Sequence, residues 1–140
     1  MGVDMYLDRR VWVQGNKDIQ VLDLGSNVRL DKIKVIVEEA GYWCKANQIH
    51  NWFVQNCGGG EDNCQECYVS REQLAELRTL CKKVLRKKSL AEELLPASGG
   101  FFFGSTEYDK YYYEDLKETV KIIDEALACE GGDFYYQASW

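Results

Sequence analysis

The stretch that most constrains the fold is a long apolar stripe near the C-terminus of this 140-residue chain. Its members recur every three or four residues, the spacing that lines one face of an α-helix. They are Tyr108, Tyr112, Leu116, Val120, Ile123 and Leu127. Ser105 or Thr106 can cap this helix at its start, and Gly131-Gly132 ends it. Because its apolar face must be buried against another element, the rest of the chain must supply a partner layer.

A second helix is marked by the sequence Ser70-Arg-Glu-Gln73, which reads as a capping box. Its expected core residues are Leu74, Leu77, Cys81, Val84 and Leu85. The basic end Arg86-Lys-Lys88 suits the negative end of the helix dipole. Ser89 can then cap a short helix to Leu95, which Pro96 stops.

Strand-forming segments occur at both ends of the chain. Residues 6–13, 19–24 and 28–30 are expected to form an antiparallel meander, with turns at 14–17 and 25–27. Asp133 to Trp140 is expected to form a final strand, and residues 101–104 a short apolar strand or buried turn. A small sheet of this kind is marginally stable alone, so it must pack on the helices.

Residues 31–41 allow two interpretations. Asp31 can cap a helix whose apolar residues Ile33, Ile36, Val37 and Ala40 lie at helical spacing before Gly41. The β-branched run over residues 33–37 keeps a strand open as the alternative. The helix is the first choice.

The aromatic stretch Gly41 to Phe53 contains the single histidine and two of the four tryptophans. A helix from Tyr42 to about Asn56 would carry a core stripe of Tyr42, Ala46, Ile49 and Phe53. The neighbouring stripe is Trp43, Asn47, His50 and Val54. That second stripe would face a site enclosed by the other aromatics.

The fold class that follows is α+β, with one domain over residues 1–140. A small antiparallel sheet, made of the N-terminal meander and the C-terminal strand, packs against about four helices. Nothing approaches an apolar run of 18 residues, so no membrane span is expected. The first ten residues lack the apolar region of a signal peptide, and the expected location is cytosolic.

The net charge of −6 disfavours nonspecific nucleic-acid binding, which depends on clustered Lys and Arg. The basic run Lys82 to Lys88 is interrupted by core residues and is best explained as a solvated helix end. A basic protein or a small ligand is the better expected partner.

The six cysteines are more typical of free thiols than of disulfides in a reducing compartment. Cys57 to Cys67 spans a glycine-rich loop, and Cys64-x-x-Cys67 has the separation of a zinc knuckle. Cys57, Cys44 or His50 could complete a zinc site. Since no second paired motif exists, no cofactor is expected, and structural zinc through Cys57, Cys64 and Cys67 stays the alternative.

His50 is the obvious candidate for acid–base chemistry, with Asn47 one turn earlier to orient it. However, no nucleophile elbow or phosphate-binding loop accompanies it. A structural, hydrogen-bonded histidine is the simpler reading. The aromatic residues are more numerous than one small core needs, so some should line a groove, a subunit interface or a ligand pocket, with plain core packing equally open.

Several segments of the chain are similar to those of a group of small bacteriophage and prophage proteins. They are Met1 to Leu7, Gly41-Tyr-Trp43, Lys45-Ala-Asn47, Ile49-His50, Trp52-Phe53, Tyr68 to Leu74, Phe101 to Tyr112 and Asp133 to Trp140. The resemblance covers nearly the whole chain and implies a phage-encoded protein acting in the host cytoplasm. It implies no mechanism. Cys44 stands where the group usually has arginine, and Cys57 and Cys67 also depart from its pattern, which weakens the zinc alternative.

These observations together predict a non-enzymatic phage accessory or counter-defence factor. It would bind and inhibit a host protein or sequester a nucleotide-like ligand, with Lys45 meeting an anion and aromatic faces stacking a base. The candidate binding residues are Trp43, Lys45, Asn47, His50, Phe103, Tyr108, Asp109 and Tyr112. The alternatives are a small hydrolase or nuclease-like enzyme using His50, and a structural or oligomeric phage protein.

Overall fold

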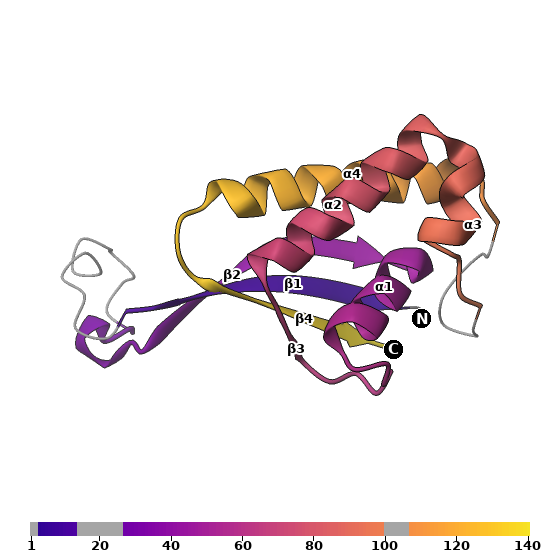
Figure 1. Ribbon diagram of the computed structural model, residues 1–140. Coiled ribbons are helices and arrows are strands. Elements are labelled where there is room, and N and C mark those ends of the chain that lie inside the picture. Colours follow the sequence, from indigo (N-terminus) through magenta and orange to yellow (C-terminus); the bar gives the residue numbers. More distant parts are fainter. Residues whose placement is uncertain (1–2, 14–26, 100–106) are drawn as a thin grey trace.

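The computed structural model describes residues 3–13, 27–99 and 107–140 (Figure 1). Its sheet has four antiparallel strands in the order β2-β1-β4-β3. They are β1 (Asp4–Trp12), β2 (Val35–Cys44), β3 (Cys67–Val69) and β4 (Asp133–Ser139). The helices are α1 (Asn47–Cys57), α2 (Arg71–Arg86), α3 (Ala91–Leu94) and α4 (Lys110–Ala128), with 3-10 turns η2 (Leu30–Lys32) and η3 (Lys88–Leu90). The expected α+β class is confirmed.

Strand β1 is central, with β2 on one side and the C-terminal strand β4 on the other. Asp4 pairs with Cys44 on β2 and with Ser139 on β4. The first and last strands, β1 and β4, are therefore the two inner strands of the sheet. The β1–β2 register shifts between Leu7 and Asp8, where Ala40 is the additional residue of a bulge. The final strand was predicted correctly from Asp133 onward.

All four helices lie on the same face of the sheet (Figure 1). The capping box predicted at Ser70 is present: the Gln73 N–H donates to Ser70 Oγ at 3.1 Å, and the Ser70 N–H donates to Gln73 Oε1 at 2.9 Å. Helix α4 begins at Lys110 with Asp109 as its N-cap, while the expected caps Ser105 and Thr106 lie outside the described residues. Leu85 of α2, and Val120 and Leu127 of α4, pack on the core but are only partly buried.

The core forms between the helices and the inner face of the sheet. Alternate residues of β1 and β4 point inward, as a half-covered sheet requires, and Met5, Leu7, Phe134 and Tyr136 are buried there. Phe53 of α1 stacks on Tyr136 with ring centroids 4.0 Å apart. The fully buried helix residues of the core include Ile49, Phe53, Leu74, Leu77, Leu116 and Ile123. This layer fixes α1 and α4, whose first turns build the candidate site.

The prediction of a helix over residues 33–40 is wrong, because β2 begins at Val35, and the strand kept open as the alternative is correct from that residue onward. The β-branched residues favour a strand, and β1 offers a complete ladder of backbone partners, so tertiary pairing decides the choice. Gly41 therefore does not stop a helix. A Cβ there would lie 2.4 Å from Ile122 Cγ2, so glycine allows α4 to approach the sheet closely.

The predicted helix over Tyr42–Asn56 is correct only from Asn47 onward. Because Tyr42 and Trp43 lie on a strand, they point to opposite faces, and their expected roles are exchanged. Tyr42 is 43% exposed, whereas Trp43 is 3% exposed and donates its indole N–H to Thr119 Oγ1 at 2.9 Å. Trp43 is thus a core residue and not part of a binding surface.

Two smaller differences complete the comparison with the sequence. Residues 28–30 form no strand and instead lead into η2, while the three-residue strand β3 was not anticipated. The expected strand at 19–24, the turn at 14–17 and the apolar segment 101–104 lie outside the described residues. Within the described ranges, no helix is long and apolar enough to cross a membrane.

Candidate functional site

An open pocket of about 330 Å³ lies where the end of β2 meets the first turns of α1 and α4. We call it the Lys45 pocket. Its lining residues include a lysine and three carboxylates: Cys44, Lys45, Asn47, Gln48, Glu107, Asp109, Tyr111, Tyr112 and Asp115. A concave site with a few convergent polar groups is the usual form of a ligand-binding pocket.

Lys45 connects β2 to α1 and has a left-handed backbone conformation, with φ at 57°. Its N–H donates to the Val3 carbonyl at 2.8 Å, and its own carbonyl accepts from the Asn47 N–H at 3.0 Å. A lysine in this conformation costs about 1 kcal/mol relative to the right-handed one. These two backbone hydrogen bonds hold the sharp turn that places Lys45 at the pocket.

Asp109 has a structural role at the pocket as well as a position in its lining. Its Oδ1 accepts from the Tyr111 N–H at 3.0 Å and from the Tyr112 N–H at 3.2 Å. A carboxylate at a helix N-terminus is stabilised by such N–H groups and by the helix dipole. The Asp109 side chain is therefore fixed at the pocket wall by the first turn of α4.

Asp115 lies one and a half turns into α4 and is half-buried beside the pocket. Burial raises the pKa of its carboxyl to about 6, and the nearby charges of Glu114 and Asp109 raise that pKa further. The Gln48 amide opposes this shift: its Nε2 lies 3.5 Å from Asp115 Oδ2 and 3.3 Å from the Tyr112 carbonyl. The electrostatic environment of Asp115 is thus negative, and its charge lacks full compensation.

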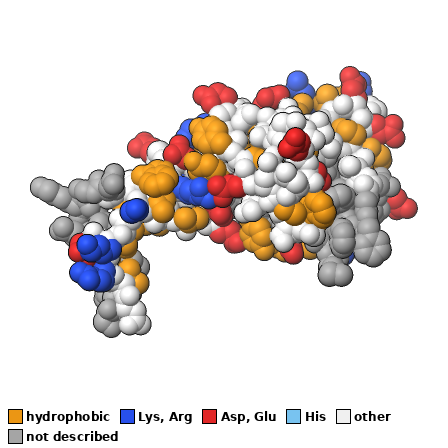
Figure 2. Space-filling view, turned by 90° about the horizontal axis from the view of Figure 1, so that it is seen from below, with side chains coloured by type: hydrophobic (Ala, Val, Ile, Leu, Met, Phe, Trp, Pro, Cys, Tyr) orange, Lys and Arg blue, Asp and Glu red, His pale blue; other side chains and the backbone are white. Residues whose placement is uncertain are grey.

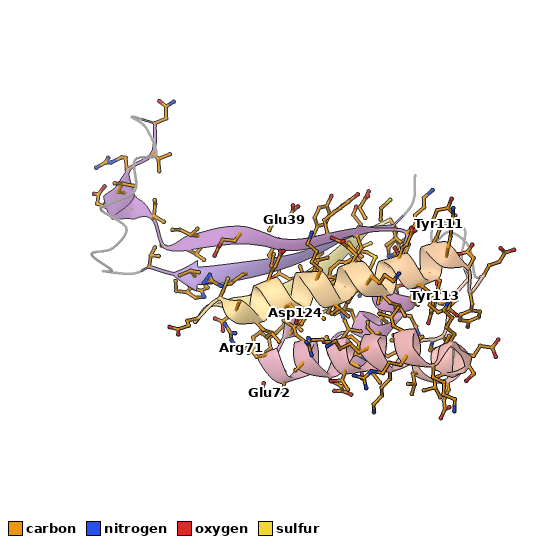
Figure 3. All side chains as sticks on the ribbon, turned by 90° about the horizontal axis from the view of Figure 1, so that it is seen from above. Glu39, Arg71, Glu72, Tyr111, Tyr113 and Asp124 are labelled. Carbon is orange, nitrogen blue, oxygen red and sulfur yellow. The ribbon has the colours of Figure 1, made fainter. Side chains whose placement is uncertain are left out.

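The two tyrosines of the pocket differ in solvent exposure and in hydrogen bonding. Tyr112 is buried, donates its hydroxyl to the Leu95 carbonyl at 2.6 Å, and has a pKa raised by burial. Tyr111 is 63% exposed, and the Lys110 ammonium lies 5.0 Å from the centre of its ring. Figure 3 shows Tyr111 projecting from the start of α4. Tyr112 therefore fixes the wall, while the Tyr111 ring is available to a ligand.

A second polar site lies around His50, one turn further along α1. His50 Nε2 lies 2.9 Å from Asp62 Oδ1, and His50 Nδ1 lies 2.6 Å from the Tyr136 hydroxyl oxygen. The Trp140 indole N–H also donates to Asp62 Oδ1, at 3.1 Å. Three distant segments of the chain thus meet at one histidine: α1, the loop containing Asp62, and strand β4.

The roles of the two ring nitrogens follow from their partners. An ionised Asp62 can only accept, so Nε2 carries a proton and donates to it. In the neutral ring, Nδ1 then accepts from the Tyr136 hydroxyl. Burial, and secondly the charge of Asp62, raise the pKa of Tyr136 well above its usual value, so this hydroxyl keeps the proton that it donates. Both nitrogens are engaged, which is the arrangement of a satisfied structural histidine.

Asn47 stands between the two sites. It lines the Lys45 pocket and also a cavity of about 210 Å³ next to His50, to which Asn51, Gln55, Asp62 and Ser98 contribute. Its Oδ1 accepts from the Ser98 N–H at 2.9 Å. Asn47 is 3% exposed, so it fixes the residue 98 backbone more than it offers a surface.

The structure separates the eight candidate residues into groups. Lys45, Asn47, Asp109 and Tyr112 line the Lys45 pocket, His50 lies at the second cavity, and Trp43 is in the core. Tyr108 packs on Tyr112 with ring centroids 5.0 Å apart, and its hydroxyl accepts from the Ala97 N–H. Phe103 lies outside the described residues.

Sequence reasoning missed other members of these sites. Glu107, Tyr111 and Asp115 of the Lys45 pocket lie in one segment where acids flank a run of three tyrosines, and that pattern could have indicated them. Gln48 follows the predicted Asn47 directly in the sequence. No local pattern distinguishes Asp62 or Tyr136 as partners of His50.

The cysteines form no disulfide, and all six are free thiols. Burial raises the pKa of Cys57 and of Cys81 to about 12, and burial also raises that of Cys67. Metal binding needs deprotonated thiols, so burial opposes it at Cys57 and Cys67. Among the described residues, no group of three or more His, Cys, Asp and Glu side chains is arranged to hold a metal ion.

Comparisons with known proteins do not extend this picture. No protein-family model matches the chain, and neither the curated proteins nor the solved structures contain a match.

Proposed function

We propose that this chain is a non-enzymatic binding protein, a phage-type accessory factor that acts in the host cytoplasm by binding a host protein. The Lys45 pocket is its binding site and receives a positively charged side chain of that protein. The phage setting is supported by the resemblance of its sequence segments. The ligand class is supported by one observation, the half-buried carboxyl of Asp115 beside an open pocket and near the carboxylates of Glu114 and Asp109.

The charge around Asp115 distinguishes between ligand classes. Its raised pKa arises from burial and from the carboxylates of Glu114 and Asp109, and Lys45 is not among its causes. An amine or guanidinium group placed there would stabilise the ionised carboxyl and gain attraction from Asp109. A phosphate would meet the opposite field. The exposed Tyr111 ring adds a surface on which a cation can lie.

A nucleotide-like small ligand is the second candidate, supported by Lys45 and Tyr111 in the pocket lining. In this arrangement Lys45 would meet a phosphate, and the Tyr111 ring would stack on a base. The carboxylates of Glu107, Asp109 and Asp115 are unfavourable to it.

Catalysis by His50 has weaker support, because both ring nitrogens already have partners inside the protein. A general base must be able to reach a substrate proton. His50 is also 4% exposed. We therefore assign His50 a structural role within the proposal.

Thermal-shift measurements on the full chain test the proposal directly. The probes are arginine amide and spermidine as cations, and linear and cyclic nucleotides as anions, each at millimolar concentration and at pH 5 and pH 8. We expect the cations to raise Tm at pH 8, more weakly at pH 5, and not in Asp115→Asn. A rise with nucleotides alone would overturn the cationic assignment in favour of the second candidate. No rise with any probe would contradict the Lys45 pocket as the binding site.

A further inference from the structure

The face of the sheet opposite the helices is rich in exposed aromatic residues. All four helices cover the other face (Figure 1), and outward-pointing residues alternate with core residues along β1 and β4. We call this surface the tyrosine face, defined by Tyr6, Tyr42, Tyr68 and Tyr135. Figure 2 views the molecule from this side and shows hydrophobic side chains spread over it.

Exposed apolar residues are concentrated there. Among the described residues, eight large hydrophobic side chains are exposed, and five of them lie on this face. The five are Tyr6, Trp12, Val37, Tyr42 and Tyr68. Scattered exposed residues need no explanation, but the four tyrosines occupy two adjacent rows of the sheet register, and such a group on one sheet face marks an interaction surface.

The tyrosines are held in fixed pairs across neighbouring strands. Tyr6 and Tyr42 have ring centroids 5.3 Å apart, and Tyr68 and Tyr135 meet edge to face at 5.8 Å. The Tyr42 hydroxyl also donates to Asp4 Oδ1 at 2.6 Å. Rigid tyrosines give contact area with little loss of side-chain entropy, which is why binding surfaces use them.

The charges on this face are mostly negative. Asp4, Asp8, Glu39 and Asp133 lie around the tyrosines, and none of them forms an ion pair with another described residue. Arg10 is the cation among them, and it is already paired with Glu66. A partner with basic side chains would therefore complement the face, whereas nucleic acid would meet net negative charge.

One contact inside the protein shows what the face accepts. The Arg10 guanidinium lies 4.0 Å from the centre of the Tyr135 ring while it pairs with Glu66. A guanidinium is thus bound by stacking on a tyrosine and by a carboxylate together, as arginine geometry favours. The same combination is repeated at Tyr6 and Tyr42 beside Asp4 and Asp8, where no arginine of the described residues stacks on either ring.

We propose that the tyrosine face is the docking surface for a basic protein that presents arginine side chains. The inference rests on the proposed function, since it names the surface and the chemistry of the bound protein. The face also meets the Lys45 pocket: Cys44, exposed at the end of β2, lines that pocket and lies two residues beyond Tyr42. A second copy of this chain is the wrong occupant, because its own face would oppose like charges.

The experiment maps amide chemical shifts by NMR while an arginine-rich peptide is added to the full chain. A lysine peptide of equal length and charge is the matched probe. We expect shifts at all four strands, β1, β2, β3 and β4, and arginine binding about 5-fold tighter than lysine binding because guanidinium stacks better on tyrosine. Equal binding of both peptides, or shifts over α2 and α4 instead, would overturn the proposal.

Variants make the assignment specific. Tyr68→Ala and Glu39→Lys should each weaken arginine-peptide binding about 5-fold, the loss of one exposed contact. Glu118→Lys makes the same charge change on exposed α4 and should leave binding unchanged within about 2-fold. An equal loss in Glu118→Lys would show attraction to net charge only and would contradict the face as a docking site.

Two further measurements separate this inference from its alternatives. Asp115→Asn should abolish cation binding at the Lys45 pocket but leave the shifts on the tyrosine face, so each proposal can fail alone. Light scattering measures the oligomeric state. A dimer that is lost in Tyr68→Ala would overturn the basic partner and show that a second copy of the chain occupies the face. A single-stranded oligonucleotide that produces the same shifts would overturn the basic partner in favour of nucleic acid.

Discussion

The His50 cluster and the Lys45 pocket lie at neighbouring turns of α1, yet their polar groups differ in how fully they are hydrogen-bonded within the protein. Around His50, both ring nitrogens, the Tyr136 hydroxyl and the Trp140 indole N–H all have partners within the protein. At the Lys45 pocket, Asp115 faces an open cavity with a raised pKa. The first arrangement satisfies its polar groups within the fold, and the second is the one that we propose binds a ligand. Whether a histidine or a carboxylate is a candidate for binding therefore depends on the hydrogen bonds and charge partners that the fold leaves unsatisfied, and not on the residue type alone.

The largest effect expected from this comparison is the loss of stability in His50→Ala. The substitution removes a buried ring and leaves the Tyr136 hydroxyl without its acceptor. We expect the free energy of unfolding to fall by about 3 kcal/mol, the sum of lost packing and an unsatisfied buried group. Urea unfolding followed by circular dichroism measures it. Asn51→Ala, one residue away and half-buried, is the control and should cost about 1 kcal/mol or less. A small loss in His50→Ala would return His50 to the catalytic candidates.

The next largest effect concerns one hydrogen bond of the same cluster. Tyr136→Phe keeps the ring that stacks on Phe53 but removes the hydroxyl that donates to His50 Nδ1. We expect a loss of about 1–2 kcal/mol in the free energy of unfolding, because a buried ring nitrogen is left unpaired. The double variant with His50→Ala provides the check. If the two losses simply add, the hydroxyl and the ring do not act as a pair.

The comparison also explains which parts of the molecule could be predicted from the sequence. The capping box at Ser70, the apolar stripes of α2 and α4, and the final strand all follow from local patterns, and they are present in the structure. The prediction for residues 33–44 was wrong because their apolar residues fit a helix locally. The backbone hydrogen-bonding partners that make them a strand belong to β1, which lies far away in the sequence. Trp43 was misplaced for the same reason.

The candidate site was predicted in part. Lys45, Asn47, Asp109 and Tyr112 were selected as polar and aromatic residues of two separate segments, and the fold brings them together at one pocket. Asp115 was missed because the acids that flank the tyrosine run show neither which of them is buried nor how far it lies from Asp109. The partners of His50 were missed because 12 and 86 residues separate it from Asp62 and Tyr136. Such pairings are decided by tertiary structure alone.

A smaller effect, of opposite sign, is expected at the pocket. Asp115→Asn should raise the free energy of unfolding at pH 8 by about 1 kcal/mol, less than the full pKa shift implies because the carboxyl is partly exposed. The folded state raises the pKa from 3.8 to about 6, so the folded protein binds more protons than the unfolded chain between those values. The stability of the native protein therefore falls as the pH rises through this window.

Unfolding of both proteins at several pH values measures this effect. The difference between them should vanish below about pH 4, where both states are protonated, and reach its maximum above about pH 6. Asp124→Asn is the control on α4, the helix that carries Asp115. It removes an exposed carboxylate that pairs with Arg78 of α2, and it should show no such gain. A less stable Asp115→Asn at pH 8 would mean that the carboxylate is already compensated, and the contrast between the two clusters would disappear.

The smallest effect on stability is expected for Tyr111→Ala, and this variant separates binding from folding most sharply. The Tyr111 side chain is 63% exposed, so its removal should change the free energy of unfolding by less than about 0.5 kcal/mol. The same change should weaken binding of a cationic probe about 5-fold, because the ring is the aromatic surface open to the ligand at that pocket. Tyr113→Ala tests a nearby residue on the same helix, whose ring packs against Lys88 and Tyr112 but does not itself line the pocket. It should leave cation binding unchanged. Isothermal titration of both variants with arginine amide measures this difference. Equal affinities would show that Tyr111 takes no part in binding. A loss of affinity confined to Tyr111→Ala would show a residue that contributes to binding and almost nothing to stability.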